Sequence, residues 1–395
     1  MRKLREAAIA GVHQTRQGDL SDRTQPEVWF ECATGACDDA GISLGDIDGL
    51  VMEGPEGVGI RSMLPAAALG HDLLGKPMRF HASSSIGASA SAAGLNLAVY
   101  AVSAGLAEAV LIDSATAGRP DGYGSADRDE AVAAMAKMSG PYEYVYGTTR
   151  VSDFAVLARR HMHEYGTTSE QLAEVAVAQR HAATLHPLSV NGHRGEITVD
   201  DVVGSRMIAD PLHLLDCCAV NQGGGAVVVT SADTVRIHKK HKAIGLLGYG
   251  EGHSHIDPNA APSLACFDAA RLAADTAFGH AGVSRDDIDV AGLADHFTIN
   301  VLFAIEAAGF CAPGESGPFV ENGGLTVDGR LPTNTGGGFL SFSHAGACGI
   351  FTLIELVEQL RGGAAERQVA NARYGYLSGS GGAMQNNFSA ILGEV

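Results

Sequence analysis

Two histidines stand where their side chains could polarise a carbonyl group or carry a proton. His344 follows a glycine-rich turn and opens a predicted helix, so its ring nitrogen could donate to a developing oxyanion; the alternative is a histidine that caps the turn. Asp295 and His296 lie on a predicted strand-to-helix connection. His296 is either an acid/base group or a structural residue, and Asp295 is either catalytic or the cap of a helix that begins near Thr298.

Two tyrosines form a second group of acid/base candidates. Tyr374 and Tyr376 precede the SGSGG loop on one face of a predicted strand, because residues i and i+2 of a strand point the same way. Either phenol could face the histidines across a pocket. The alternative is that both pack in the core with hydrogen-bonded hydroxyl groups.

An internal repeat shows which elements position these residues. The segments ACDDAGISLGDID (36–48) and AFGHAGVSRDDID (277–289) share Ala, Gly, Ser and Asp-Ile-Asp at a constant offset. In each copy an Ala-rich helix ends at Gly, and a turn then leads to a short apolar strand at 49–52 or 290–293. The chain therefore contains two related halves.

Both halves continue in the same way. In the first half the pattern predicts strands at 78–82, 109–112 and 223–231 and a helix at 89–104. In the second half the corresponding segments are residues 334–335, a helix at 345–360 and a strand at 368–374. Alternating strands and helices predict an α/β fold with buried, mostly parallel sheets and with helices between and outside two of them. We expect halves at 1–242 and 243–395, and a helical insertion over 115–212 with helices at 151–165 and 169–184.

Several motifs carry a family resemblance. Together with the duplicated halves, Asp210-Pro211-Leu212, LPTNTGGG (331–338) and SGSGGAM (378–384) resemble the thiolase superfamily over essentially the whole chain. The segments 295–310 and 159–172 look like sterol-carrier-protein thiolases and their lipid-transfer-protein relatives. Some of those relatives are aldolases that shorten steroid side chains as CoA thioesters. The resemblance implies a five-layered αβαβα fold from two duplicated halves, a homodimer, and coenzyme A as part of the substrate with no tightly bound cofactor.

The residues at the family's catalytic positions differ from those of a thiolase. The nucleophilic cysteine falls on Ala88, the second cysteine on Gly379, and the Asn or His of the third motif on Ala294, where the aldolases carry a Tyr. Of the four positions only the histidine remains, as His344. A methyl group cannot attack a thioester, so acyl transfer through cysteine at Ala88 is not expected.

Cleavage of a carbon–carbon bond in a β-hydroxyacyl-CoA needs neither cysteine, since a base and hydrogen-bond donors for the thioester oxygen suffice. We therefore predict a retro-aldol lyase or its reverse. Its substrate and oxyanion pocket would include Ser85, Ala88, Ala294, Gly379, Ser380 and Gly381. Two alternatives remain: an acyltransferase with another nucleophile, such as a serine of residues 83–89, and a non-catalytic subunit of an acyl-CoA-processing complex.

The acyl group and the partners are the remaining expectations. Steroid, aromatic and branched acyl groups all suit a Phe-, Leu- and Tyr-lined pocket, to which the segment 142–147 either contributes or serves as a loop anchor. The resemblance also implies a small OB-fold, zinc-ribbon partner subunit. In this chain no metal site is expected, because His161/His163, His253/His255 and Cys217/Cys218 lack metal-binding spacing.

Composition limits the remaining classes of function. A net charge of −18, from 45 acidic and 27 basic residues without a basic run, argues against nucleic acid as a partner. Seven cysteines, an odd number without CxxC spacing, favour a reducing compartment, so we expect a cytoplasmic protein. No apolar run reaches the roughly 18 residues of a membrane helix, and no membrane association is expected.

Overall fold

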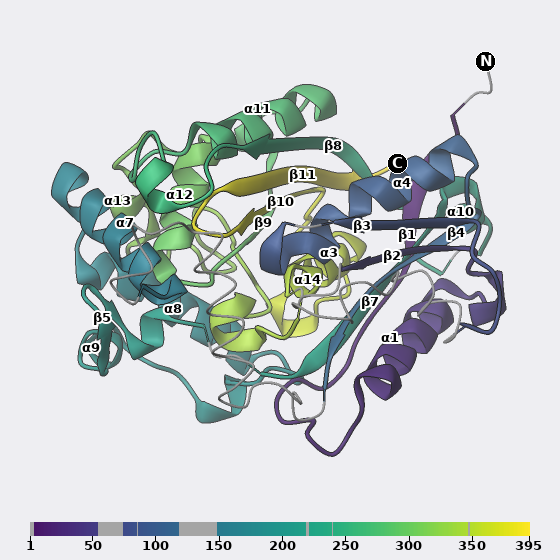
Figure 1. Cartoon of the computed structure of the whole chain (residues 1–395), viewed down its shortest axis with the longest axis horizontal. Helices are drawn as coiled ribbons and strands as arrows, with labels where there is room; N and C mark the ends of the chain where they lie inside the picture. The colour runs from purple at the N-terminus through teal and green to yellow at the C-terminus, as the bar shows by residue number, and fades with distance from the viewer. Residues whose placement is uncertain are drawn as a thin grey trace.

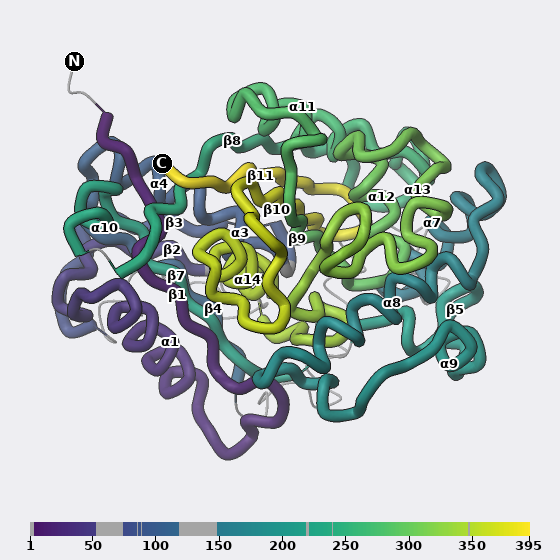
Figure 2. Tube along the Cα trace, turned by 180° about the vertical axis from the view of Figure 1, so that it is seen from behind, coloured from purple at the N-terminus to yellow at the C-terminus, as the bar shows by residue number. Residues whose placement is uncertain are grey.

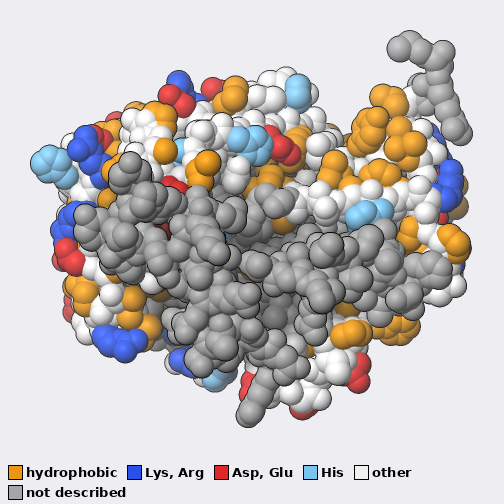
Figure 3. Space-filling model, viewed as in Figure 1, with side chains coloured by type: hydrophobic (Ala, Val, Ile, Leu, Met, Phe, Trp, Pro, Cys, Tyr) orange, Lys and Arg blue, Asp and Glu red, His pale blue; other side chains and the backbone are white. Residues whose placement is uncertain are grey.

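The computed structural model describes residues 4–53, 74–84, 86–117, 148–218, 221–238, 240–346 and 348–395 (Figure 1). Ser85 and the segment 142–147 therefore lie outside the described residues. Within the described parts, no helix is long and apolar enough to cross a membrane. On the face shown in Figure 3, the Lys and Arg side chains are scattered around the edge and form no continuous patch.

Within the described residues, nine strands form the large sheet, in two groups that meet at a single pair, Ile9 with Ile244. The first group has the order β3-β2-β4-β7-β1 and the second the order β8-β11-β10-β9. The first-group bounds are β1 Ala7–Gln14, β2 Gly49–Glu53, β3 Phe80–Ser84, β4 Ala109–Thr116 and β7 Gly223–Ser231. The second-group bounds are β8 Ile244–His253, β9 Val290–Leu293, β10 Tyr374–Gly381 and β11 Asn386–Glu394.

The strand pairing repeats between the two groups. β2 is parallel to β3 and β4, and β7 is antiparallel to β4 and β1. In the second group β9 is parallel to β10, while β11 is antiparallel to β10 and β8. An isolated parallel bridge between Ala291 and Thr333 occupies the place that β3 has in the first group. The predicted duplication is confirmed in this pairing; the exact boundary between residues 242 and 243, just before β8, stays a prediction.

The repeated sequence segments fold alike. Helices α1 (Gln25–Ala40) and α11 (Asp268–Ala281) both end at a glycine with positive φ, 73° at Gly41 and 68° at Gly282. The short 3-10 helices η1 (Leu44–Asp46) and η8 (Arg285–Asp287) follow. In each, an aspartate accepts hydrogen bonds from the backbone and hydroxyl of a serine three residues earlier, which fixes the turn into the next strand.

Helices lie in three layers around the two groups of strands, giving the expected five-layered α/β fold (Figure 1). The central layer contains α3 (Ala90–Ala93), α4 (Leu95–Ala104) and α14 (Gly349–Arg361), and Figure 2 shows α14 in the middle of the molecule. One outer face is covered by α1 and α10 (Ala232–His238), the other by α11 and α12 (Thr298–Ala308). Each layer buries its own apolar cluster, and the cluster of the central layer contains residues from both halves.

The central layer depends on close contact between its helices. A Cβ placed on Gly349, the first residue of α14, would lie 2.9 Å from the Cα of Ser89 at the start of the first half's central helices. Only glycine permits this approach. The beginnings of the two duplicated central helices therefore meet directly.

The insertion forms a helical region at one side of the molecule (Figure 2). It contains α7 (Arg150–Tyr165), α8 (Ser169–Thr184), α9 (Val199–Val203) and the short pair β5 (Met207–Ala209) and β6 (Leu212–His213). The helix predicted at 169–184 is confirmed, as is its capping box between Thr168 and Gln171. The small helix α13 (Ser316–Val320) of the second half packs against α8.

Three predicted elements differ from the structure. The helix predicted over 89–104 is divided at Gly94, where a Cβ would lie 2.6 Å from a methyl group of Val51, so strand β2 crowds the helix at that point. The helix predicted from 345 begins only at 349: the π-helix η9 (Gly338–Phe342) ends before it, and Gly346 between them has a φ of 51°, which a right-handed helix does not allow. The strand predicted at 368–374 is wrong: η10 (Ala365–Arg367) precedes it, and β10 begins at Tyr374.

Candidate functional site

The two predicted histidines lie together. His296 follows β9 on the way into α12, and His344 follows η9 shortly before α14. Their ring centroids are 5.2 Å apart, with the ring planes at 75°. The Phe339 ring packs against both, at 5.0 Å from His296 and 6.0 Å from His344. The structure thus brings the two half-buried imidazoles together against one aromatic ring.

Both imidazoles are uncharged at neutral pH. Burial lowers the pKa of His296 to about 3, with further lowering by His344 and by the positive charge of Arg150. Burial also lowers the pKa of His344. A neutral imidazole has one N–H donor and one lone pair, so the pair can donate to one substrate atom and accept from another.

Asp295 positions the pocket but is not the cap of α12. Its carboxylate is fully buried and accepts hydrogen bonds from the backbone N–H groups of Phe339, at 2.7 Å, and Leu340, at 3.2 Å. It therefore binds the start of η9, the element that leads to His344. Gly338 allows this contact, since a Cβ there would lie 2.2 Å from Asp295 Oδ2. Phe297, not Asp295, precedes α12 as its N-cap residue.

Asn334 and Asn221 hold the two chain segments that carry the histidines. The Asn334 side chain accepts from the backbone N–H of Leu293, at 2.7 Å, and donates to its carbonyl oxygen, at 2.8 Å. It thereby fastens the glycine-rich turn to the end of β9. The backbone N–H of His344 donates to Asn221 Oδ1 at 2.7 Å.

Replacing Asp295 by asparagine is expected to remove a pH dependence of stability. Burial raises the pKa of Asp295 from 3.8 to about 7, so between these values the folded protein binds a proton that the unfolded chain has lost. The free energy of unfolding of the wild type therefore falls, through this group, as pH rises across that window. Urea unfolding at several pH values should show the wild-type value declining relative to that of Asp295→Asn. A difference between the two proteins that is independent of pH would contradict this assignment.

Tyr374 and Tyr376 lie away from the imidazole pair. Tyr376 is 1% exposed, stacks on Phe278 at 5.5 Å and donates or accepts a hydrogen bond with Ser389 at 2.8 Å. Tyr374 shares its strand face and packs in the same outer apolar cluster, between β10 and the helices α11 and α12. The predicted common face is thus present, but it points to the outer layer. The structure does not bring either phenol to the imidazole pair.

The glycine loop contacts the start of the central helices. A Cβ on Gly381 would lie 2.7 Å from the Ile86 carbonyl oxygen, next to η3 (Gly87–Ser89), which contains Ala88. Ala294 donates its backbone N–H to the Ser378 carbonyl oxygen at 3.0 Å. Ala294, Gly379 and Ser380 line one small cavity, and Tyr376 contributes to the same wall, so this tyrosine lies beside the predicted pocket residues although not beside the histidines. Ser85, the remaining predicted pocket residue, lies outside the described residues.

Introducing the thiolase cysteine by Gly379→Cys is expected to destabilise the fold by about 1–3 kcal/mol, as overpacking of a filled core does. A Cβ at this position would lie 2.2 Å from the Phe388 ring and 2.6 Å from the Ser89 side chain. Urea unfolding measures the loss. The matched control is the double variant Gly379→Cys/Phe388→Ala, in which the Phe388 clash is absent; a single variant as stable as wild type would show that the pocket accepts a side chain at residue 379.

Cys348 is the site residue that the sequence interpretation missed. Its sulfur and one ring nitrogen each of His296 and His344 all lie within 4.8 Å of one another. Cys348 is the N-cap residue of α14 and is buried. The family resemblance places the nucleophilic thiol at the central helix of the first half. The duplication is the signal that could have found Cys348, because it makes the start of α14 the matching position in the second half.

The other predicted structural histidines and cysteines have protein partners. His161 hydrogen-bonds Thr167 at 2.8 Å and Glu306 at 3.1 Å. His253 hydrogen-bonds Asn386 and Glu251, and the Cys217 thiol donates to the His213 carbonyl oxygen at 3.3 Å. These contacts fit the structural roles predicted for them.

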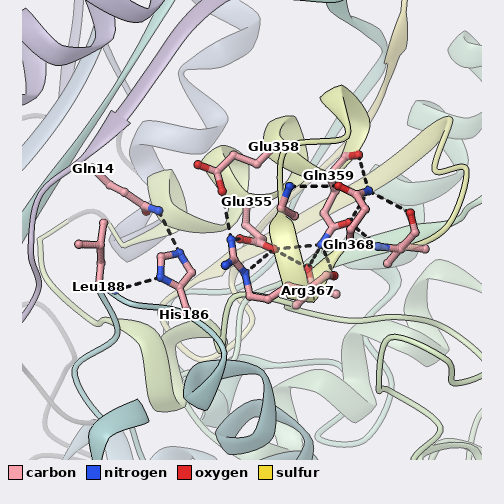
Figure 4. A network of polar contacts seen from close by, with 11 residues as sticks. Gln14, His186, Leu188, Glu355, Glu358, Gln359, Arg367 and Gln368 are labelled. Atoms are coloured by element: carbon pink, nitrogen blue, oxygen red, sulfur yellow. Dashed lines mark hydrogen bonds and ion pairs between the residues drawn. The ribbon is translucent and has the colours of Figure 1, made fainter.

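A second polar cluster lies deeper in the central layer (Figure 4). His186, Glu355 and Glu358 are close enough together to suggest a cation site, but the Arg367 guanidinium already lies between the two carboxylates. It contacts Glu355 at 3.0 Å and Glu358 at 3.2 Å. Arginine thus supplies the positive charge, and the cluster is a buried ion-pair network.

Comparisons with known proteins agree with this architecture. Residues 250–394 match the family described as thiolase C-terminal domain-like. Over 96% of this chain and 97% of its own length, an acetyl-CoA acetyltransferase of Methanothermobacter thermautotrophicus is 32% identical. The chain belongs to the thiolase superfamily.

Two further members of the thiolase superfamily are informative. A steroid side-chain-cleaving aldolase of Thermomonospora curvata is 33% identical over 89% of this chain and 90% of its own length. The solved structure named Ltp2-ChsH2(DUF35) aldolase superposes with a TM-score of 0.85 at 30% identity, covering 100% of this chain and 99% of the matched one. The predicted resemblance to the sterol-carrier and lipid-transfer branch of the thiolase superfamily is confirmed.

Proposed function

We propose that this chain is an acyl-CoA carbon–carbon lyase that cleaves a bulky β-hydroxyacyl-CoA by a retro-aldol reaction, or forms it in the reverse direction. The observation that carries the proposal is the pair of neutral imidazoles, His296 and His344, whose ring centroids lie 5.2 Å apart in a thiolase-type fold. The names of two similar proteins, a steroid side-chain-cleaving aldolase and the Ltp2-ChsH2(DUF35) aldolase, support the reaction class.

The imidazole pair supplies what the reaction needs. In our proposal His344 donates its N–H to the thioester oxygen, and the His296 lone pair accepts the proton of the β-hydroxyl group. The bond between the α- and β-carbons breaks, its electron pair forms the enolate of the shortened thioester, and the β-carbon leaves as a ketone or aldehyde. Protonation of the enolate carbon completes the balance. The low pKa of His296 keeps its lone pair available in the resting enzyme.

The residues at the lost thiolase positions fit this reaction better than acyl transfer. Gly379 has no room for a cysteine, and Ser89 is 1% exposed, with no hydrogen-bond partner for its hydroxyl and thus no activating base among the residues that the structure describes. The serine nucleophile considered from the sequence therefore receives no support at this position.

The direct test is a product assay. The purified protein would be mixed with synthetic β-hydroxyacyl-CoA esters bearing steroid, aromatic or branched acyl groups, and products followed by liquid chromatography and mass spectrometry. We expect equal amounts of a carbonyl compound and a shortened acyl-CoA from at least one ester. Intact substrates in every case, with the partner subunit present, would overturn the proposal.

A second candidate is an acyltransferase that uses Cys348. Its thiol lies within 4.8 Å of ring nitrogens of both histidines, so a side-chain rotation would bring it within hydrogen-bond reach of a base. One similar protein is named an acetyl-CoA acetyltransferase. Intact-mass measurement after mixing with acyl-CoA distinguishes the two reactions: a stable acyl adduct that Cys348→Ser abolishes would favour the acyltransferase.

We also propose a partner subunit and a cytoplasmic location. The name of the solved Ltp2-ChsH2(DUF35) aldolase gives two components, which supports the expected OB-fold, zinc-ribbon partner. All seven cysteines lie in the described parts of the chain and none is in a disulfide, in keeping with a reducing compartment. We also propose the homodimer that the resemblance implies. Co-expression with the product of a neighbouring OB-fold gene, followed by light scattering, tests for both the complex with that subunit and the homodimer of this chain.

A further inference from the structure

We propose that His296, His344 and Cys348 form a binding site for a divalent ion of the zinc type. Each residue offers one ligand atom, a ring nitrogen or the sulfur, and these atoms all lie within 4.8 Å of one another. His296 comes from the end of β9, while His344 and Cys348 flank the approach to α14. The three ligands therefore come from two separate segments of the second half.

The distances suit a tetrahedral ion after a small movement. Zinc binds imidazole nitrogen at about 2.0–2.1 Å and thiolate sulfur at about 2.3 Å, so its ligand atoms are separated by about 3.3–3.7 Å. Separations of up to 4.8 Å require a contraction of about 1 Å, which side-chain rotation supplies. Two nitrogens and one sulfur select zinc-type ions over Mg²⁺ and Ca²⁺, which prefer oxygen ligands.

The placement of the three ligands favours an ion. The sulfur belongs to Cys348, the N-cap residue of the 13-residue helix α14, and the nitrogens belong to two imidazoles whose ring centroids lie 5.2 Å apart. The three ligand atoms therefore lie together near the start of one helix.

The other three-residue cluster in the described chain shows what a satisfied site looks like. There the Arg367 guanidinium already pairs with both Glu355 and Glu358, and its positive charge disfavours a second cation beside it. Among the described residues, neither imidazole of the His296–His344 pair makes a comparable ion pair; each packs on the other and on Phe339. The two clusters are therefore chemically different.

Three protein ligands leave a fourth position open, as in catalytic rather than structural zinc sites. Both histidines are half-buried rather than fully enclosed. If the proposed lyase function holds, on which this step rests, the ion would polarise the thioester oxygen in place of the imidazole N–H. Because the ion would also occupy the lone pair of His296, the β-hydroxyl proton would then pass to hydroxide from solution. Binding of the ion itself does not depend on the reaction.

Cobalt provides the test, because Co²⁺ bound to a thiolate absorbs in the near ultraviolet and tetrahedral Co²⁺ absorbs strongly in the visible. The full-length protein would be treated with a chelator, dialysed and titrated with Co²⁺, and Zn²⁺ would then be added as competitor. We expect both bands to saturate at about one Co²⁺ per chain and to disappear with Zn²⁺.

Variants assign the ligands. Cys348→Ser should abolish the thiolate band, and His296→Gln should weaken Co²⁺ binding by about 100-fold or more, whereas the matched control Cys311→Ser should bind as wild type does. Absence of the bands in wild type, or a thiolate band that survives in Cys348→Ser, would overturn the site. Circular dichroism confirms that each variant is folded.

A lyase assay on the same samples separates this inference from the proposed function. Carbon–carbon cleavage by protein that shows no Co²⁺ bands overturns the metal site and leaves the lyase proposal standing. Co²⁺ bands in protein that cleaves no ester support the metal site and count against the lyase. Cleavage that the chelator removes and Zn²⁺ restores supports both.

Discussion

Replacing His344 by alanine is expected to lower kcat for carbon–carbon cleavage by about 100- to 1000-fold, the usual cost of removing one donor from a developing oxyanion. The imidazole is neutral, half-buried and 5.2 Å from the His296 ring, so its loss removes the donor proposed for the thioester oxygen. KM should change much less than kcat, because the donor acts mainly in the transition state. Steady-state kinetics on the complex with its partner measure both constants.

The control for this experiment is His253→Ala. His253 hydrogen-bonds Glu251 and Asn386 on the protein surface, and its loss should leave kcat unchanged. The double variant His296→Ala/His344→Ala should lose little more than either single variant, since residues that act as a unit are not additive. Full activity of His344→Ala would instead favour the alternative that this chain is a non-catalytic subunit.

Replacing Arg367 by methionine is expected to lower the free energy of unfolding by about 3–5 kcal/mol, because it leaves buried carboxylates without their counter-ion. Arg367 and Glu355 are 5% and 6% exposed, and the guanidinium also reaches Glu358 (Figure 4). Burial together with Glu355 already raises the pKa of Glu358 to about 7. Urea unfolding monitored by circular dichroism measures the change.

An exposed ion pair provides the comparison. Arg159 and Asp210 pair with side chains 54% and 66% exposed, so Arg159→Met should cost less than about 1 kcal/mol. The double variant Arg367→Met/Glu355→Gln should recover part of the stability, because it removes one of the stranded carboxylates. Equal losses for Arg367→Met and Arg159→Met would show that the buried network contributes no more than a surface pair.

The sequence predicted the fold well because the signals were local. The repeat around Gly41 and Gly282 records helix ends and turns, which depend on neighbouring residues, and the structure reproduces them. The resemblance pointed to His344 in the segment after the glycine-rich turn, and in the structure Asn334 holds that turn to β9; the catalytic role of His344 stays a prediction.

What the sequence could not predict depends on contacts between distant segments. Asp295 binds the backbone of Phe339 and Leu340, more than forty positions away, so its role could not be separated from that of a helix cap. Tyr376 was placed on the correct strand face, but only the packing of α11 and α12 shows that this face points outward. The network of Gln14, His186 and Arg367 joins three remote parts of the chain and left no local signal (Figure 4).

The contact between Gly349 and Ser89 also limits how the two halves can evolve. After a duplication, each copy is free to accumulate its own changes wherever it faces solvent or its own core. At this point one copy presses against the other, and any larger residue at 349 would displace the beginnings of both central helices and with them Cys348. The residues at positions 89 and 349 must therefore change together, even where the rest of the two copies has diverged.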